Sequence, residues 1–118
     1  MLNEFGYRND TACNGEEAIA MVVSRQKENC CQYKVIIMDC HMPKMNGYEA
    51  TKTLKNLIKE RKISDTIIIA CSADISKANH KKCLESGCEL LIGKPIEKLF
   101  LQNFLNNHLW LYLNYMLF

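Results

Sequence analysis

Residues 35–47 read Val35-Ile36-Ile37-Met38-Asp39-Cys40-His41-Met42-Pro43-Lys44-Met45-Asn46-Gly47. This stretch decides the fold, because a continuously apolar run, typical of a strand buried on both faces, ends in a carboxylate and a loop punctuated by proline and glycine. In open parallel sheets ligands bind at the carboxyl ends of the strands, so we expect Asp39 to carry the chemistry. As an alternative, Asp39 would cap a helix beginning near Gly47. That alternative fits poorly, since an N-cap directly precedes the first turn.

Strand-like and helix-like segments alternate along the rest of the chain. We expect strands at 35–38, 66–71 and 89–92, a weak strand at 7–13, and helices at 16–26, 47–60, 75–86 and 96–107. Residues 1–5 resemble a last helical turn closed by Gly6. In the last helix the predicted buried stripe is Ile96, Leu99, Phe100 and Phe104. The alternation predicts right-handed βαβ units, and therefore an α/β fold with a parallel sheet.

Composition limits both the size of the fold and its partners. A chain of 118 residues with 48% hydrophobic residues can hold one domain with one core. Its 15 basic and 13 acidic residues give a net charge of +2 without a basic stripe, so no binding to nucleic acid is predicted. No signal peptide is recognisable, and the apolar tail 109–118 is about half as long as a membrane-spanning helix, so no membrane insertion is expected.

The seven cysteines follow no paired spacing. We interpret them as reduced, mostly buried thiols of an intracellular protein. A zinc site would recruit Cys30, Cys31, Cys40 and His41. It is disfavoured, because there is no C-x-x-C motif and structural zinc requires four well-spaced ligands.

Polar residues end two further predicted strands, Ser72 after the strand at 66–71 and Lys94 after that at 89–92. Each has an ordinary alternative: Ser72 or Asp74 would cap the following helix, and Lys94 would be a solvated lysine. Beside Asp39, however, the three groups suit phosphoryl capture. A carboxylate can form an acyl phosphate, while an ammonium and a hydroxyl stabilise the phosphoryl oxygens. Mg²⁺ normally assists such chemistry.

The chain resembles the receiver domain of two-component response regulators, most closely those of hybrid histidine kinases. The resemblance runs from about residue 5 to residue 105 and rests on the loop 38–51, on Asn14-Gly15-Glu16-Glu17-Ala18, on Ser72-Ala73 and on Lys94-Pro95. It implies a flavodoxin-like, doubly wound parallel sheet in which Asp39 is the phosphoacceptor, Ser72 the switch hydroxyl and Lys94 the phosphate-sensing lysine. It also implies Mg²⁺ bound by Asp39 and the backbone carbonyl of His41, and a cis Lys94-Pro95 bond. The expected partner is a histidine kinase or histidine phosphotransfer domain, and the expected location is cytoplasmic, alone or within a larger membrane-attached kinase.

The sequence departs from the family pattern at two places. Receivers begin with a hydrophobic strand and an acidic pair that holds Mg²⁺, and this sequence starts after both. We therefore expect residues 1–107 to form a receiver without its first strand and most of its first helix, followed by an apolar tail at 108–118. The missing strand is central in the family order 2-1-3-4-5, so its absence would open the sheet. The second departure is Leu91, which stands where the family often carries an aromatic switch residue.

The tail has three interpretations. It would extend the last helix, be an artefact of a mispredicted gene end, or fill the gap as a two-faced strand in which Leu109, Leu111, Leu113 and Tyr115 share one parity.

Three functions fit these features. The leading prediction is a phosphorelay receiver, which is a signalling domain with at most self-catalysed phosphotransfer rather than an enzyme. The alternative is a pseudo-receiver that binds partners independently of phosphate, because the acidic pair is missing. A hydrolase of the aspartyl-phosphate type is disfavoured, since those enzymes place a second acid where this chain has His41.

Overall fold

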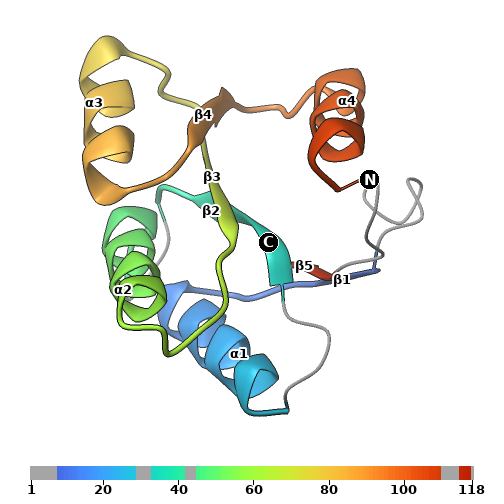
Figure 1. The fold of residues 1–118 in the computed structure, drawn as a ribbon. Helices are drawn as coiled ribbons and strands as arrows, with labels where there is room; N and C mark the ends of the chain where they lie inside the picture. The colour runs from blue at the N-terminus through green and yellow to red at the C-terminus, as the bar shows by residue number, and fades with distance from the viewer. Residues whose placement is uncertain (1–7, 29–32, 42–44, 110–114, 118) are drawn as a thin grey trace.

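The computed structural model describes residues 8–28, 33–41, 45–109 and 115–117. Strands and helices alternate throughout (Figure 1). The strands are β1 (Arg8–Asp10), β2 (Tyr33–Asp39), β3 (Ile67–Ser72), β4 (Leu90–Gly93) and β5 (Tyr115–Leu117). The helices are α1 (Gly15–Glu28), α2 (Gly47–Lys59), α3 (Lys77–Ser86) and α4 (Lys98–Leu109). The predicted α/β class is confirmed.

All described strands are parallel and form one sheet in the order β1-β5-β2-β3-β4. Strands β2 and β3 lie at its centre, and Asp39 pairs in register with Cys71. Ser72 in turn pairs with Gly93 on β4. The carboxyl ends of three neighbouring strands therefore meet at one edge, as the sequence predicts.

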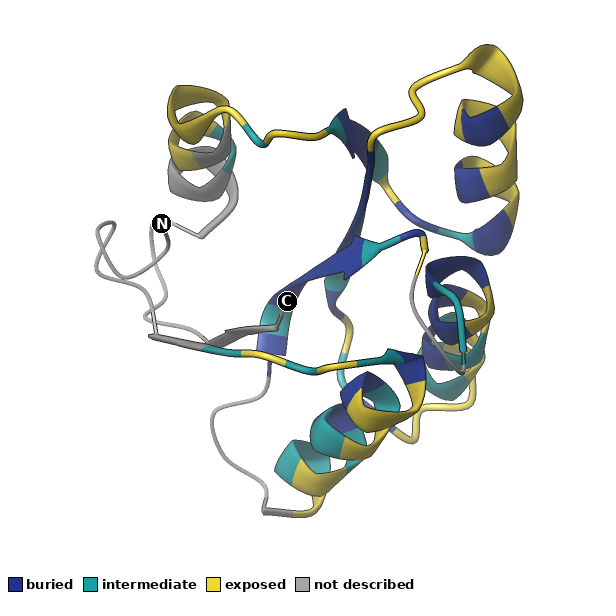
Figure 2. Ribbon diagram, turned by 180° about the vertical axis from the view of Figure 1, so that it is seen from behind, coloured by how far each residue is buried: buried dark blue, intermediate teal, exposed yellow. Residues whose placement is uncertain are grey.

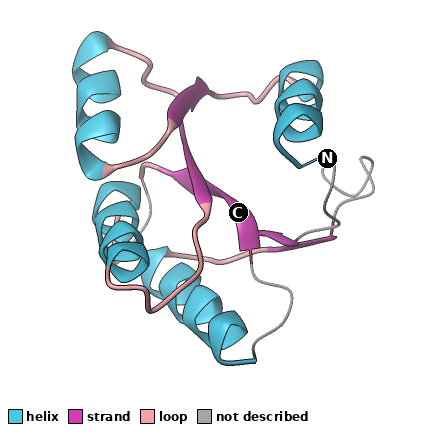
Figure 3. Ribbon diagram, in the orientation of Figure 1, coloured by secondary structure: helices cyan, strands magenta, loops and turns pink. Residues whose placement is uncertain are grey.

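The two faces of the sheet are covered unequally (Figure 3). Ile36 and Met38 of β2 belong to the larger core cluster, which they share with residues of α1, α2 and α3. Val35 and Ile37 point to the opposite face, where Phe104 of α4 packs. Successive connections from β1 to β4 run in one direction across the sheet, and only the connection through α4 returns. Right-handed crossovers require a returning helix to use the other face, which explains the position of α4.

Local capping explains where the helices begin and end. Asn46 caps α2 by accepting a hydrogen bond from the Glu49 backbone N–H at 3.0 Å, so Asp39 is not its N-cap. Ser76 caps α3, which makes the alternative of Ser72 or Asp74 as the cap wrong. Gly87, with a φ of 106°, ends α3 in the left-handed conformation that glycine adopts without steric cost.

The carboxyl-terminal strand occupies the position where the family resemblance predicts a gap. Helix α4 continues to Leu109, and β5 then pairs with β1 on one side and β2 on the other. The replacement-strand interpretation is therefore the one that the structure adopts, after a short extension of the helix. Leu111 and Leu113, which the predicted strand included, lie outside the described residues, and the division at residue 107 stays a prediction.

Three details differ from the sequence prediction. The sequence predicts that Leu99 and Phe100 are buried, but they are 69% and 44% exposed, and the first turn of α4 is solvent-facing (Figure 2). The reason is that α4 is the one described helix on its face of the sheet; among the side chains described at 96–104, Ile96 before the helix and Phe104 within it pack against the core. Helix α3 begins at residue 77 rather than 75, and β1 is shorter than the predicted 7–13. The predicted helical turn at 1–5 and Gly6 lie outside the described residues.

The described cysteines are free thiols, and four of the five are buried, in agreement with the packing role expected of them. Within the described residues no three His, Cys, Asp or Glu side chains come together as a metal site; Cys30 and Cys31 of the zinc alternative lie outside those residues. None of the described helices combines the length and apolarity needed to cross a membrane.

Candidate functional site

Asp39 and Lys94 meet at the carboxyl edge of the sheet. The Lys94 Nζ donates a hydrogen bond to the Asp39 Oδ2 at 2.5 Å, across two strand ends that are 55 residues apart in sequence. Both side chains are partly exposed, 36% for Asp39 and 43% for Lys94, so both are accessible from solvent. The carboxylate raises the pKa of Lys94 through this hydrogen bond, and the lysine therefore stays charged at neutral pH.

The backbone around Asp39 is fixed by short contacts. The His41 N–H donates to Asp39 Oδ1 at 3.0 Å, and the Gly47 N–H donates to the Cys40 carbonyl oxygen at 3.1 Å. A Cβ on Gly47 would overlap the Asp39 carbonyl oxygen and lie 2.9 Å from the Cys40 Cα. Glycine is thus required at position 47 because the start of α2 packs directly on the strand end that carries Asp39.

Among the described hydrogen bonds, none joins the Ser72 Oγ to the side chains of Asp39 and Lys94. The Ser72 side chain is buried, and its Oγ accepts the Asp74 backbone N–H at 3.0 Å. The Ser72 carbonyl oxygen accepts the Lys94 backbone N–H at 2.9 Å, which ties the two strand ends together. The Lys94-Pro95 peptide bond that follows is cis, as the resemblance predicts. The structure therefore brings the side chains of Asp39 and Lys94 into contact and ties Ser72 to Lys94 through the backbone, while the Ser72 hydroxyl bonds the loop that follows β3.

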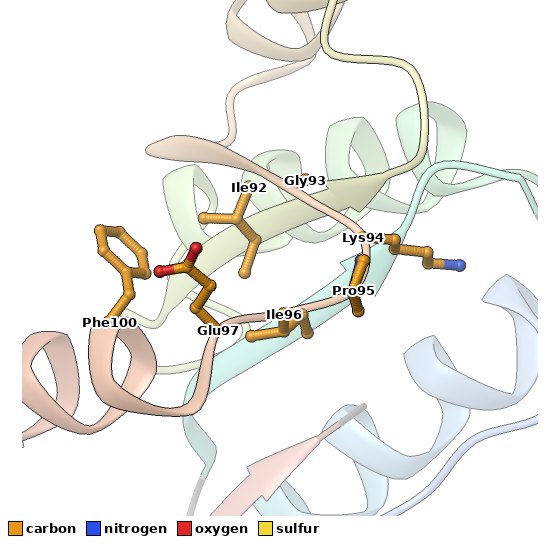
Figure 4. Close-up of a pocket in the computed structure, with 7 residues that line it drawn as sticks. All are labelled: Ile92, Gly93, Lys94, Pro95, Ile96, Glu97 and Phe100. Carbon is orange, nitrogen blue, oxygen red and sulfur yellow. The ribbon is translucent and has the colours of Figure 1, made fainter.

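A cavity of about 330 Å³ opens beside Asp39 and Lys94. Its wall also includes Cys71, Ile37 and the segment 11–13 after β1. A larger cavity of about 480 Å³ lies along residues 92–97 and Phe100, but Asp39 does not line it and Figure 4 shows the Lys94 side chain directed away from Ile92, Glu97 and Phe100. The smaller cavity is therefore the candidate site. Sequence reasoning missed its wall at 11–13, because those residues carry no charged group.

The described residues do not by themselves suit Mg²⁺. Asp39 is the one carboxylate among the residues lining the smaller cavity, and Lys94 already contacts it. The backbone carbonyl of His41, expected from the resemblance, would add one neutral oxygen. Mg²⁺ in proteins is held by carboxylates together with waters and phosphate oxygens. Without a second acid, the ammonium of Lys94 is the main positive charge facing Asp39.

Comparison with protein families gives a match between residues 1–106 and the model described as the response regulator receiver domain. The hybrid signal transduction histidine kinase B of Dictyostelium discoideum is 35% identical over 105 residues, which cover 82% of this chain and 5% of that protein. Histidine kinase 1 of Arabidopsis thaliana is 38% identical over 88 residues, which cover 70% of this chain and 7% of that protein. The chain thus spans a small part of these curated relatives.

Solved structures show the same fold. The chemotaxis protein CheY4 of Vibrio cholerae has 28% sequence identity and a TM-score of 0.72, with 92% of this chain and 82% of that chain covered. The receiver domain of a sensor histidine kinase from Pseudomonas aeruginosa, solved with a magnesium ion in its active site cleft, has 29% identity and a TM-score of 0.67. That comparison covers 91% of this chain and 80% of the other.

Proposed function

Because the chain belongs to the response regulator receiver domain family, we propose that it acts in a phosphorelay by accepting a phosphoryl group from phosphohistidine onto Asp39. The observation that carries the proposal is the 2.5 Å contact between Asp39 and Lys94 beside an open cavity at the carboxyl edge of the sheet. A receiver domain is a signalling domain rather than an enzyme, and its catalytic contribution is to its own phosphorylation.

The proposed transfer uses the groups at the strand ends. A carboxylate oxygen of Asp39 attacks the phosphorus, the bond from phosphorus to the imidazole nitrogen of the donor breaks, and an acyl phosphate forms. The histidine nitrogen leaves with the electron pair of that bond. The Lys94 ammonium moves to contact the negatively charged phosphoryl oxygens, and the Ser72 hydroxyl donates a hydrogen bond to one of these oxygens. Such transfers depend mainly on positioning and charge stabilisation, which these residues supply.

A bound Mg²⁺ would neutralise charge on the phosphoryl group, with Asp39 and the His41 carbonyl oxygen as its protein ligands. The described residues fall short of a full set, so Lys94 carries the charge stabilisation in the proposed transfer. This shortfall favours a second candidate function, a pseudo-receiver that binds its partner independently of phosphate. Titration with Mg²⁺ distinguishes the two, because a competent receiver binds the ion and a pseudo-receiver does not.

The proposed partner is a histidine kinase or a histidine phosphotransfer domain, and the proposed location is cytoplasmic. The direct test incubates the chain with a phosphorylated histidine phosphotransfer domain and Mg²⁺. We expect an acid-stable, base-labile phosphate that Asp39→Asn abolishes and that Lys94→Ala reduces. Lys52→Ala removes an exposed lysine of α2 outside the cavity, so it is the matched control and should leave labelling unchanged. Absence of label on the unaltered chain would count against the receiver function and favour the pseudo-receiver.

A further inference from the structure

A chain of hydrogen bonds leads from Ser72 into the space between α2 and α3. The Asp74 N–H donates to the Ser72 Oγ at 3.0 Å, and the Asn79 Nδ2 donates to the Asp74 carbonyl oxygen at 2.5 Å. The Tyr48 hydroxyl then donates to the Asn79 Oδ1. Buried polar groups that all have hydrogen-bond partners hold a defined geometry, because breaking one of the bonds leaves a buried group that water cannot reach without a partner.

Three of the residues joined by these hydrogen bonds are buried, so their bonds face no competition from water. Ser72 is 1% exposed, Asn79 5% and Tyr48 7%. Asn79 uses both ends of its amide, one toward the loop after β3 and one toward α2. The same loop is held again at Ser76, whose N–H donates to the Asp74 Oδ1 at 2.9 Å. Residues 73–76 of this loop are exposed, so these bonds to Ser72 and Asn79 are what anchor it to buried groups.

The chain of hydrogen bonds joins α2 and α3, the helices that follow the strands ending in Asp39 and Ser72. Tyr48 is the second residue of α2, directly after the loop that begins at Asp39, and Asn79 lies in the first turn of α3. The sulphur atoms of Cys40, directly after β2, and Cys83 of α3 lie 3.7 Å apart, so α3 also packs closely on the end of the strand that carries Asp39. At the outer end, the Lys82 ammonium lies 4.3 Å from the centre of the Tyr48 ring. A change at Ser72 therefore has a short path to a charged surface residue.

We propose that Tyr48 and Asn79 are positioning residues that hold the Ser72–Asp74 segment in its unphosphorylated arrangement and transmit its movement to the surface of α2 and α3. The inference rests on the proposed phosphorylation of Asp39. When the Ser72 Oγ turns toward a phosphoryl group, it gives up the Asp74 N–H, and the released segment alters the bond from Asn79 to Asp74. Leu91 is buried at the position where the family often has an aromatic switch residue, so this path supplies a different connection.

Whether removing one of these hydrogen bonds speeds or slows phosphorylation depends on which arrangement of the Ser72–Asp74 segment the bonds stabilise. They are present in the unphosphorylated structure, so removing one favours the alternative arrangement. Tyr48→Phe deletes only the hydroxyl and keeps the buried ring. We expect it to speed phosphorylation of Asp39 about 3- to 10-fold, the factor given by one net hydrogen bond. In a Ser72→Ala background the same substitution should have no effect on the rate, because the first link is already missing.

The experiment measures the rate of Asp39 phosphorylation by phosphoramidate with Mg²⁺ for the unaltered chain, Tyr48→Phe, Ser72→Ala and the double variant, with thermal unfolding as the check on folding. Tyr33→Phe is the matched control, since it removes another buried tyrosine hydroxyl that bonds Asp10 instead. Equal rate effects of Tyr48→Phe with and without Ser72 would overturn the proposed path while leaving phosphorylation intact. No phosphorylation of the unaltered chain would overturn the proposed function, and the path with it.

Discussion

Disrupting the carboxyl-terminal strand should destabilise the whole domain, although β5 has only three residues. β5 is an interior strand of the sheet: it pairs at three positions with β1 and at three with β2. In the substitution Met116→Pro the backbone N–H is lost and the ring cannot be accommodated in a strand paired on both sides. We expect the entire short strand to detach, because no described residue of β5 lies more than one position away from the proline.

The magnitude follows from the pairing. Three pairs on each side give about six ladder hydrogen bonds, and at ~0.5–1.5 kcal/mol net for each bond the loss is ~3–9 kcal/mol. A typical domain has a free energy of unfolding of ~5–15 kcal/mol. The loss also leaves β1 without its described strand partner and opens the edge of β2 beside Val35 and Ile36, which are 0% and 1% exposed.

Urea unfolding followed by far-ultraviolet circular dichroism tests this expectation. With a slope of about 1–3 kcal/mol per molar urea, the calculated loss moves the midpoint by roughly 1 M or more, or removes the cooperative transition. Met116→Ile is the matched control, since isoleucine keeps the N–H and favours strands. Equal midpoints and slopes for the proline and isoleucine variants would refute the reasoning, because β5 would then contribute nothing to the sheet.

Three further perturbations have defined outcomes. Gly47→Ala should destabilise the fold by ~1–3 kcal/mol or more and slow phosphorylation of Asp39, because its Cβ meets backbone, whereas Gly93→Ala meets only a side-chain methyl at 3.2 Å; equal stability of the two variants would contradict this. Leu54→Ala should cost ~2–5 kcal/mol in chemical denaturation, since Leu54 is fully buried, and a loss below ~1 kcal/mol would show that the site is not closely packed. Burial raises the pKa of Tyr33 to about 12. The contribution of the neutral Tyr33 hydroxyl to stability is therefore complete below pH 10 and is lost as the pH rises through about 12. The absorbance transition at 295 nm that disappears in Tyr33→Phe should be centred near pH 12, and a centre near pH 10 would contradict the burial.

The sequence predicts the central strands and the site edge well because local and global signals agree there. Continuous apolar runs specify β2 and β3, and the residue that ends each run must lie at the carboxyl edge of a parallel sheet. The contact between Asp39 and Lys94 follows from topology rather than from spacing, since the two residues are 55 positions apart. Sequence reasoning could therefore bring them together once the parallel order was assumed.

Other features depend on tertiary context that a single sequence does not reveal. The exposure of Leu99 and Phe100 reflects how many helices share a face of the sheet, which helical periodicity cannot indicate. The bond from Tyr48 to Asn79 escaped prediction because a polar residue on a polar helix gives no sign of burial. A partial signal was present: Asn79 and Cys83 are four residues apart and so share the inward face of α3.

Charge at the strand ends links the two candidate functions. Lys94 neutralises Asp39 in the described structure, and a cation that binds the same carboxylate must compete with an ammonium whose pKa the carboxylate has raised. Removing the ammonium should therefore strengthen Mg²⁺ binding in Lys94→Ala if Asp39 is a real ligand, while phosphorylation becomes slower because the phosphoryl oxygens lose their positive partner. A pseudo-receiver, which binds partners independently of phosphate, should show neither change. A higher affinity for Mg²⁺ together with slower phosphorylation in Lys94→Ala would therefore identify the chain as a receiver.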